Sequence, residues 1–384
     1  MGTKPRVIFV SSNVGAGHRQ AAKALLAGLN QADPSIEAQW VDALDYASRA
    51  FRMYYSGGYA TMVSHLPRLY GFGYRLTDRP HGPHRALSER KRLWTERLAI
   101  RRFHRWLLTQ RPVLVVNTHF LAPTGIGRMI ARGVEGLRQM TVVTDNELHR
   151  WWCSENVEQY FVPAESCRER LIDFGVPPER IELTGIPVHP KWTAPVDAGK
   201  VYADWNLPSD RPIVLVSGGV DFTIGRIDKI AAEICTRLPK VFVLVLAGGN
   251  KKLMARVACQ PRAQGDHPCL RAVGFTDRIQ ELAHVASLIV TKPGGMITTE
   301  CLTKGVGMVL LKPVPGQETA NAQMLCREGA AVMALSAGEV VSQVARLLEN
   351  PARLESLRAN ARRLARPATE MIVSRIVQAV NDWK

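Results

Sequence analysis

The chain has 384 residues, which is too long for one ordinary hydrophobic core and predicts two domains. Its hydrophobic content of 46% is that of a globular protein, no apolar run approaches the ~20 residues of a membrane span, and the first residues predict a strand, not a signal peptide. The 7 cysteines form no CxxC pair, which argues against a disulfide or zinc framework, and the net charge of +16 favours a partner that carries phosphate.

The first expected element is a strand over residues 6–12, followed by a glycine loop and an Ala/Leu-rich helix. Gly15 and Gly17 shape this loop, but a dinucleotide fingerprint would need a third glycine where Gln20 stands, so an NAD site is not favoured. His18 ends the loop. It is either a general base, because imidazole titrates near neutral pH, or a polar residue at a helix start that touches only water.

Residues 46–110 interrupt the alternation of strands and helices with aromatic side chains set among arginines and lysines. Within residues 49–111, 14 Lys and Arg stand against 3 Asp and Glu, so +11 of the +16 charge lies there. Aromatic rings beside cations suit a membrane interface, where rings enter the headgroup zone and cations meet lipid phosphate. A solvated basic face over an ordinary core is the alternative. Nucleic acid is a third option, less favoured because no nucleic-acid-binding module accompanies the charge.

Two further strands, residues 113–116 and 140–144, are expected before the middle of the chain. The second leads to Asp145, which could position an acceptor hydroxyl, act as a base, or cap a helix. Asp145 and Glu147 superficially resemble a metal-binding pair. Helix dipoles can stabilise a diphosphate without a metal, so we predict no essential metal and no cofactor.

The second half begins after a polar, proline-bearing stretch and repeats the pattern of strand, glycine turn and helix. Strands are expected over residues 213–216 and 241–246, each followed by a glycine-containing turn. Candidate ligand-contacting residues follow the strands of this half: Gly218 and Gly219, then Asn250, then Phe275 and Thr276.

Residues 288–321 hold the most informative pattern of the chain: strand, glycine turn, helix, strand and polar loop. Gly294 and Gly295 allow a ligand to approach closely, and the helix they open offers unpaired N–H groups and a positive dipole end to a diphosphate. Glu300, about a turn into that helix, can accept two hydrogen bonds from a ribose diol. The loop carries side chains that read sugar hydroxyls: Gln317, Glu318 and Asn321. An ordinary strand–helix–strand unit with a glycine turn is the alternative.

This stretch resembles the donor-site signature of one glycosyltransferase family in two motifs, Lys292-Pro293-Gly294-Gly295 with Glu300 and Pro315-Gly316-Gln317-Glu318 with Asn321. The family contains the monogalactosyldiacylglycerol synthases and the processive diacylglycerol glucosyltransferases, and it is related to the N-acetylglucosaminyltransferase that makes the peptidoglycan lipid precursor. Three other features extend the resemblance over most of the chain: the glycine loop ending in His18-Arg19, the strand end Thr144-Asp145, and the Gly-Ile-Pro-Val turn at residues 185–188.

The resemblance implies an α/β fold of the GT-B type, in which two Rossmann-like domains face a cleft. It implies an acceptor- and membrane-binding domain over residues 1–190, a UDP-sugar-binding domain over residues 191–366, and a C-terminal helix within residues 367–384 that packs back on the first domain. Family members often carry Arg where this chain has His189, so Lys191 or Arg211 would have to supply that charge to the donor diphosphate.

The resemblance also implies an enzyme that moves galactose or glucose from a UDP-sugar to diacylglycerol with inversion, His18 or Asp145 acting as the base. The implied donor site consists of Gly218, Gly219, Asn250, Phe275, Thr276, Lys292, Gly294, Gly295, Glu300, Gln317, Glu318 and Asn321. The implied acceptor and membrane side consists of Gly15, Gly17, Arg68, Tyr70, Trp94 and Trp106. We expect a cytoplasmic protein, peripheral on an anionic inner membrane face, that binds no nucleic acid. The alternatives are the peptidoglycan-precursor transferase, a non-catalytic UDP-sugar sensor at the membrane, and a UDP-sugar epimerase.

Overall fold

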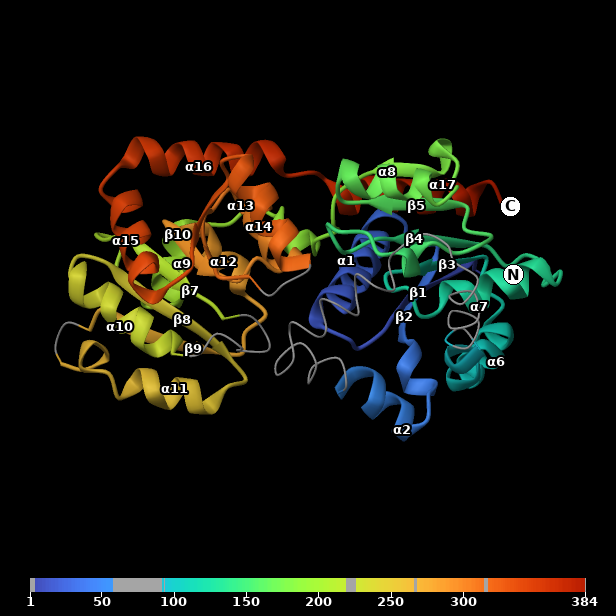
Figure 1. Cartoon of the computed structure of the whole chain (residues 1–384), viewed down its shortest axis with the longest axis horizontal. Helices are drawn as coiled ribbons and strands as arrows, with labels where there is room; N and C mark the ends of the chain where they lie inside the picture. Colours follow the sequence, from blue (N-terminus) through green and yellow to red (C-terminus); the bar gives the residue numbers. More distant parts are fainter. Residues whose placement is uncertain are drawn as a thin grey trace. The chain divides into compact units, whose positions relative to one another are not determined.

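The computed structural model describes residues 4–57, 92, 94–218, 226–265, 268–313 and 317–383. The chain divides into two compact units (Figure 1). The N-terminal domain comprises Met1–Pro190 together with Arg366–Lys384, and the C-terminal domain comprises Lys191–Ala365. Three residues singled out from the sequence, Arg68, Tyr70 and Gly219, lie outside the described part of the chain.

The described residues of the N-terminal domain form a six-stranded sheet in the order β2-β1-β3-β4-β5-β6, and every neighbouring pair is parallel. Its strands are rich in buried Val, Ile, Leu and Phe because helices cover both faces of a parallel sheet. The strands are β1 (Arg6–Ser11), β2 (Glu37–Asp42), β3 (Leu114–Asn117), β4 (Gln139–Val142), β5 (Gln159–Val162) and β6 (Ile181–Leu183). The order reverses between β1 and β3, and in such sheets ligands bind where the reversal leaves a crevice at the carboxyl edge.

The helical segments of this domain include α1 (Ala16–Ala32), η1 (Ala43–Tyr46), α2 (Arg49–Arg52), the π-helical η2 (Met53–Gly57), α6 (Arg101–Gln110), α7 (Pro123–Ala131), α8 (Glu165–Asp173) and the C-terminal α17 (Ala368–Asn381), and residues 94–99 are helical as well. One core joins α1 and α17 to the sheet. Gly28 is needed there, because a Cβ at this position would lie 2.7 Å from the Thr369 methyl carbon. The last helix therefore packs closely on the first one.

The described residues of the C-terminal domain also form a six-stranded parallel sheet, in the order β12-β11-β10-β7-β8-β9. The order reverses between β7 and β10, so a second switch point lies at the carboxyl ends of these two strands. The strands are β7 (Ile213–Val216), β8 (Phe242–Gly248), β9 (Leu270–Gly274), β10 (Leu288–Thr291), β11 (Gly307–Leu311) and β12 (Ala331–Ala334).

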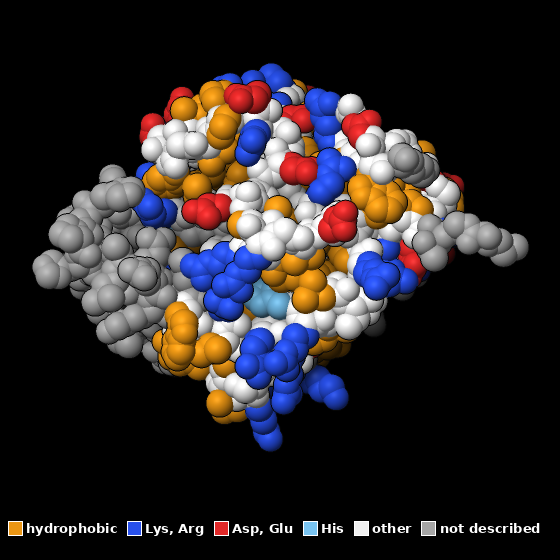
Figure 2. Space-filling view, turned by 90° about the vertical axis from the view of Figure 1, so that its right-hand side faces the viewer, with side chains coloured by type: hydrophobic (Ala, Val, Ile, Leu, Met, Phe, Trp, Pro, Cys, Tyr) orange, Lys and Arg blue, Asp and Glu red, His pale blue; other side chains and the backbone are white. Residues whose placement is uncertain are grey.

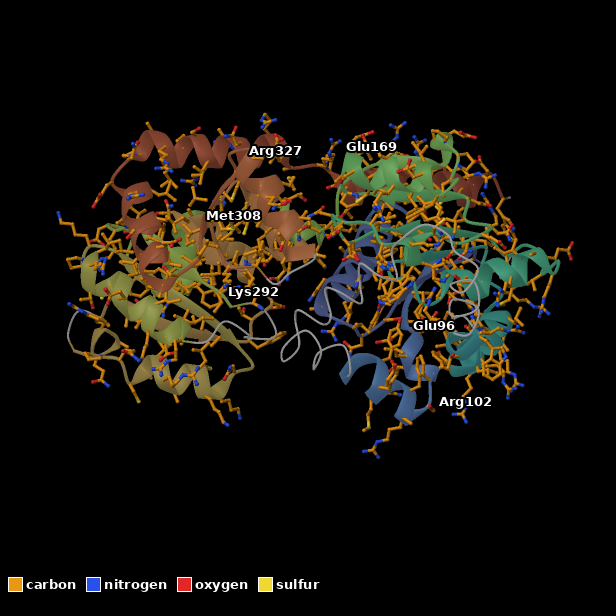
Figure 3. The ribbon with its side chains drawn as sticks, in the orientation of Figure 1. Glu96, Arg102, Glu169, Lys292, Met308 and Arg327 are labelled. Carbon is orange, nitrogen blue, oxygen red and sulfur yellow. The ribbon has the colours of Figure 1, made fainter. Side chains whose placement is uncertain are left out.

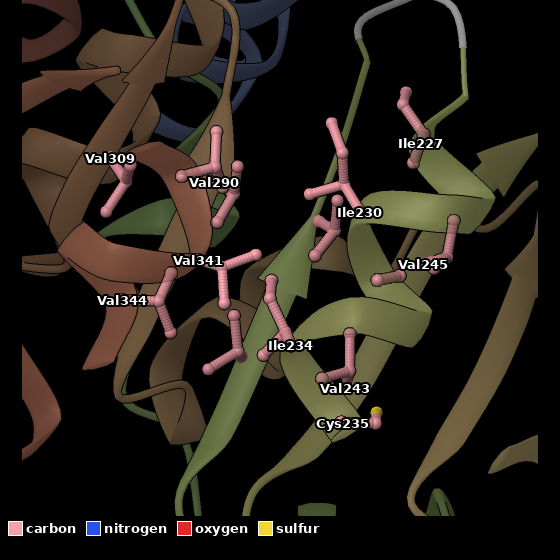
Figure 4. Close-up of a cluster of buried hydrophobic side chains, with 14 of the residues drawn as sticks. Ile227, Ile230, Ile234, Cys235, Val243, Val245, Val290, Val309, Val341 and Val344 are labelled. Carbon is pink, nitrogen blue, oxygen red and sulfur yellow. The ribbon is translucent and has the colours of Figure 1, made fainter. Parts of the chain in front are cut away.

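The helices of the C-terminal domain pack on this sheet around one large apolar core, in which side chains of α10 and α15 meet Val243, Val245 and Val290 (Figure 4). The helices are α9 (Ala198–Asp204), α10 (Ile227–Arg237), α11 (Lys251–Ala258), α12 (Ile279–Val285), α13 (Gly295–Lys304), α14 (Gln317–Arg327), α15 (Ala337–Leu348) and α16 (Pro351–Leu364). The remaining 3₁₀ turns of the two domains are η3 (Arg150–Trp152), η4 (Pro178–Arg180), η5 (Pro190–Trp192) and η6 (Pro261–Ala263).

The polar loop expected after β11 is instead the start of a helix, since α14 begins at Gln317 and carries Glu318 and Asn321 in its first turns. Its sequence explains the difference. Ala, Gln, Met and Leu are good helix formers, and Glu318 in the first turn complements the helix dipole. Among the described residues, no helix is long and apolar enough to cross a membrane.

Candidate functional sites at the two switch points

The switch point of the N-terminal domain gathers polar side chains from three chain segments. His18 lies in the first turn of α1, Thr118 directly follows β3, and Thr144 follows β4. The His18 Nδ1 atom lies 3.0 Å from the Thr118 carbonyl oxygen and 2.6 Å from Thr144 Oγ1. The Thr118 hydroxyl donates in turn to the His18 carbonyl oxygen at 2.9 Å. Backbone and ring of His18 are therefore both fixed to the sheet edge.

Aromatic rings surround this histidine. The His119 ring meets it edge to face with centroids 4.6 Å apart, and the buried Trp152 ring lies 5.9 Å away. His119 is itself buried, and its Nδ1 accepts from the Leu121 amide. Burial, and then the charge of His18, hold the pKa of His119 well below its usual range. His119 therefore remains neutral at physiological pH.

Asp145 lies at the same edge, one residue after Thr144, and is half-buried. Its Oδ2 accepts from the Trp152 indole N–H at 3.1 Å. The Asp145 and Asn146 carbonyl oxygens lie 3.5 and 3.4 Å from the Cys167 sulfur. The Asp145 carboxylate thus accepts a hydrogen bond from an aromatic side chain at the same sheet edge, and its predicted role as base or acceptor-positioning group stays a prediction.

The glycines of the loop before α1 differ in what the fold requires of them. Gly15 has a φ of 76°, a conformation that other residues rarely adopt. Gly17, in the first turn of α1, has no such constraint, and a Cβ there would meet nothing within 4 Å. Open space in front of Gly17 is what a ligand approaching this edge would occupy.

The switch point of the C-terminal domain lies between the buried Gly218, after β7, and the turn Lys292–Gly295, after β10. Lys292 is buried and sits at the carboxyl end of β10 (Figure 3). Gly294 caps α13 with a φ of −71°, and a Cβ there would meet only an Ile297 methyl carbon at 3.7 Å. Neither backbone conformation nor packing requires glycine at this position. Close approach of a ligand to the helix start would require it.

Glu300 lies in the second turn of α13 and occupies an unusual environment for a carboxyl. Burial raises its pKa to about 8, against the opposing effects of the nearby Lys191 charge and a hydrogen bond from the Trp192 side chain. Trp192 is buried, and Lys191 also donates to the Asp277 carbonyl oxygen. Glu300 itself is half-buried, so the fold holds a carboxyl in a poorly solvated site near the glycine turn and places a cation close to it.

Asn321, which is predicted to read sugar hydroxyls, makes a hydrogen bond within the protein at this sheet edge. It is 3% exposed, and its Nδ2 donates to the Pro293 carbonyl oxygen at 2.8 Å. Asn321 therefore ties the start of α14 to the glycine turn before α13. Glu318, one turn earlier, is half-buried on the same helix.

Other predicted donor-site residues also follow strands of this sheet. Asn250, after β8, caps α11, since its Oδ1 accepts from the Leu253 amide at 2.9 Å. Phe275, after β9, is 86% exposed, and the neighbouring Thr276 hydroxyl accepts from the Arg278 amide. An aromatic ring this exposed at a sheet edge has room to contact a ligand.

The two tryptophans predicted to face a membrane differ in burial. Trp94 is 63% exposed, whereas Trp106 on α6 is half-buried against Tyr46 and Phe103. Exposed cations accompany Trp94, and one of them, Arg102 on α6, points outward (Figure 3). Figure 2 shows Lys and Arg side chains gathered among apolar ones on one face of the molecule.

Comparisons with known proteins bear on both domains. Residues 18–188 match the family model of monogalactosyldiacylglycerol (MGDG) synthase, and residues 213–374 match that of the glycosyltransferase family 28 C-terminal domain. A processive diacylglycerol beta-glucosyltransferase of Bacillus subtilis (strain 168) is 27% identical over 371 residues, which cover 95% of this chain and 92% of the relative. Over nearly its whole length the chain is thus similar to the diacylglycerol glycosyltransferases, as its sequence motifs predict.

Solved structures agree with this assignment at the level of the fold. A Staphylococcus aureus MnaA–UDP structure superposes with a TM-score of 0.63 at 14% identity, covering 98% of this chain and 97% of that one. Acinetobacter baumannii MurG superposes with a TM-score of 0.56 at 16% identity, covering 97% and 99%. The predicted α/β fold with two Rossmann-like domains of the GT-B type is confirmed for this chain.

Several residues at the two switch points were given no role from the sequence alone: Thr118, His119, Thr144, Trp152 and Trp192. The signal for the first three was available, because each comes within two residues of the end of a buried parallel strand. Trp192 gave no such signal. It lies in the short 3₁₀ turn η5 and does not follow a strand of the C-terminal sheet.

Proposed function

We propose that this chain transfers a hexose, glucose or galactose, from a UDP-sugar to the free hydroxyl of diacylglycerol, with inversion at the anomeric carbon. The observation that carries the proposal is the C-terminal switch point, where a glycine turn opens α13 and a half-buried carboxyl with a raised pKa follows in its second turn. The N-terminal switch point adds an oriented imidazole. Similarity to the diacylglycerol glycosyltransferases supports diacylglycerol as the acceptor.

In this account the donor binds to the C-terminal domain. Backbone N–H groups at Gly294 and Gly295 meet the diphosphate, and Glu300 accepts hydrogen bonds from the ribose hydroxyls. Gln317 and Glu318 contact the sugar. Asn321 holds the glycine turn through its Nδ2, and its buried Oδ1, which has no partner among the described residues, accepts from a sugar hydroxyl.

The positive charge that family members draw from an arginine at the His189 position comes here from Lys191. This residue is close enough to Glu300 to oppose the rise in its pKa. Arg211 is the weaker choice, because it lies 3.5 Å from Asp210 in an exposed ion pair. Lys191 therefore supplies a cation beside the proposed donor site, in addition to the buried Lys292 before the glycine turn.

The reaction needs one proton acceptor and one group that stabilises the departing diphosphate. His18 takes the proton of the lipid hydroxyl, whose oxygen bonds to the anomeric carbon from the face opposite UDP. The bond between that carbon and the UDP oxygen breaks with its electron pair, so UDP leaves as an anion. The positive end of α13 offsets the charge that grows on the diphosphate.

The N-terminal domain is also the part that meets the membrane in this proposal. Exposed arginines at positions 101, 102 and 105 share the α6 region with the exposed Trp94 and with Leu98, which is 47% exposed. Such a surface suits anionic headgroups, with the aromatic and aliphatic side chains entering the interface. The acceptor lies in that interface, so the surface brings the enzyme to its substrate.

The test is transfer from radiolabelled UDP-glucose and UDP-galactose to vesicles that contain diacylglycerol, with the His18→Ala variant as control. Label in the lipid fraction, lost in the control, supports the proposal, and a β-linked product shows inversion. Label transferred only to the peptidoglycan lipid precursor would assign the chain to that branch. Binding without transfer would indicate a sensor, and conversion of the donor without any lipid would indicate an epimerase.

A further inference from the structure

The hydrogen bonds of His18 determine which of its ring nitrogens carries a proton. A carbonyl oxygen can only accept, so the Nδ1 atom that lies 3.0 Å from the Thr118 carbonyl oxygen must be the donor. The Thr144 hydroxyl oxygen, 2.6 Å from the same Nδ1, then accepts as well. In the neutral ring the one nitrogen-bound proton is therefore on Nδ1, and Nε2 keeps its lone pair.

The groups around this ring offer no competing proton acceptor at Nδ1. His119 faces it edge to face, but His119 is buried and neutral. The Asp145 carboxylate follows Thr144 in the chain and accepts from the Trp152 indole. Nδ1 of His18 thus contacts a hydroxyl and a carbonyl, whereas many catalytic histidines have a carboxylate at this position.

We propose that Thr144 is a positioning residue for the transfer reaction: its hydroxyl, together with the Thr118 carbonyl, holds His18 in the tautomer whose Nε2 accepts the proton of the lipid hydroxyl. The inference rests on the proposed function, in which His18 is the base. Once Nε2 has taken the proton, the Nδ1–H of the imidazolium donates more strongly to the same two oxygens. The two oxygens therefore stabilise the charged product of the proton transfer as well as the reactive tautomer.

Two substitutions in one strand region separate this role from a general effect on the fold. Thr144→Val removes the hydroxyl at constant shape. Thr141→Val does the same within β4, where the Thr141 hydroxyl is buried and has no hydrogen-bond partner among the described residues. Thr144→Ser keeps the hydroxyl and loses only a methyl group.

We expect Thr144→Val to lower kcat roughly 10- to 100-fold, a part of the ~10²–10⁴-fold that general base catalysis supplies. KM for the UDP-sugar should change by less than about twofold, because the donor binds elsewhere. The acid limb of the kcat profile should move to lower pH, since the imidazolium has lost an acceptor. Thr144→Ser should recover most of kcat, and Thr141→Val should match the wild-type enzyme. A Thr144→Val enzyme with wild-type kcat and an unmoved acid limb would overturn the proposal.

A second measurement does not depend on turnover. Nitrogen NMR of the full chain labelled with ¹⁵N-histidine distinguishes the two neutral tautomers, and His18→Gln assigns the signal. The expected result is the Nδ1–H form in the wild-type protein, with a weaker preference for it in Thr144→Val, where the Thr118 carbonyl oxygen remains as the acceptor at Nδ1; an Nε2–H form in the wild-type protein would overturn the inference. If no transfer is detected with any donor, the proposed function fails while this measurement still decides whether Thr144 sets the tautomer.

Discussion

The two domains of this protein share a topology and differ in the chemistry placed at the same point of it. Each has a six-stranded parallel sheet whose order reverses beside its first strand, and in each a glycine turn opens a helix there. The N-terminal domain places the imidazole of His18 in the first turn of that helix. The C-terminal domain places the carboxyl of Glu300 in the second turn.

The surroundings of these two side chains fit different tasks. His18 is half-buried, and its Nδ1 meets two neutral oxygens, so its second nitrogen can exchange a proton with a ligand. Glu300 lies where burial outweighs the influence of Lys191 and Trp192 and raises its pKa to about 8. In the proposed reaction the first domain moves the proton, and the second presents a half-buried carboxyl to hydroxyl groups of the ligand.

The largest expected effect comes from removing the imidazole. His18→Ala should lower kcat by roughly 10²–10⁴-fold, the contribution of a positioned general base, and leave the Kd of UDP unchanged because the C-terminal domain binds it. Steady-state kinetics and calorimetry measure the two quantities. His284→Gln, at an exposed site on α12, is the control. Near-normal turnover of His18→Ala would transfer the role of base to Asp145.

A second difference is where basic residues are concentrated, since residues 49–111 of the N-terminal domain alone carry a net charge of +11, and this predicts the next largest effect. Changing Arg101, Arg102 and Arg105 together to Gln should weaken binding to anionic vesicles roughly 100-fold at low salt, and less at high salt. Vesicle sedimentation measures this binding. A charge-matched triple variant of the C-terminal domain, at the exposed Lys240, Arg346 and Arg353, should bind like the wild-type protein. Equal losses in both triple variants would show that net charge, and not this surface, attracts the membrane.

The sequence was sufficient to predict the parts that depend on local pattern. Buried β-branched runs predicted β1, β7 and β10, and the glycines after them predicted the turns at the two switch points. The stretch from Gln317 is predicted from sequence to be a loop, because it starts with Pro-Gly and carries polar side chains. The residues that follow have high helix propensity. The structure shows α14 there.

Contacts between distant residues were beyond such reasoning. Thr144 is 126 residues from His18 in the chain, and only the order β1-β3-β4 brings their side chains within 2.6 Å. Asn321 is 28 residues from Pro293, and its amide donates to the Pro293 carbonyl oxygen. A sequence pattern identifies polar residues at strand ends. It does not show which of them contact a ligand and which hold the other residues in place.

Removing the Glu300 carboxyl tests its proposed role in donor binding by the C-terminal domain. Glu300→Ala should weaken UDP binding by about 1–3 kcal/mol, roughly 5- to 150-fold, the scale for hydrogen bonds to a charged group. Calorimetry measures the affinity, and Glu349→Gln, exposed after α15, is the control. In the wild-type protein UDP-glucose should bind more tightly as pH rises through 8, because ionised Glu300 is the better acceptor for the ribose hydroxyls. An unchanged UDP affinity in Glu300→Ala would remove this residue from the donor site.

The smallest expected effect concerns the stability of the ligand-free protein. The pKa of Glu300 is about 8 in the folded state and near 4.5 in the unfolded chain, so the folded state binds more protons between these values. The stability that this carboxyl contributes is fully present below pH 4.5 and is lost as pH rises through 8. Glutamine cannot ionise, so the Tm of Glu300→Gln should exceed that of the wild-type protein increasingly between pH 5 and pH 9, by a few degrees at the upper end. Differential scanning calorimetry across this range measures the difference in Tm between the two proteins. Parallel Tm curves would show that the Glu300 carboxyl is well solvated, and not held in a poorly solvated site.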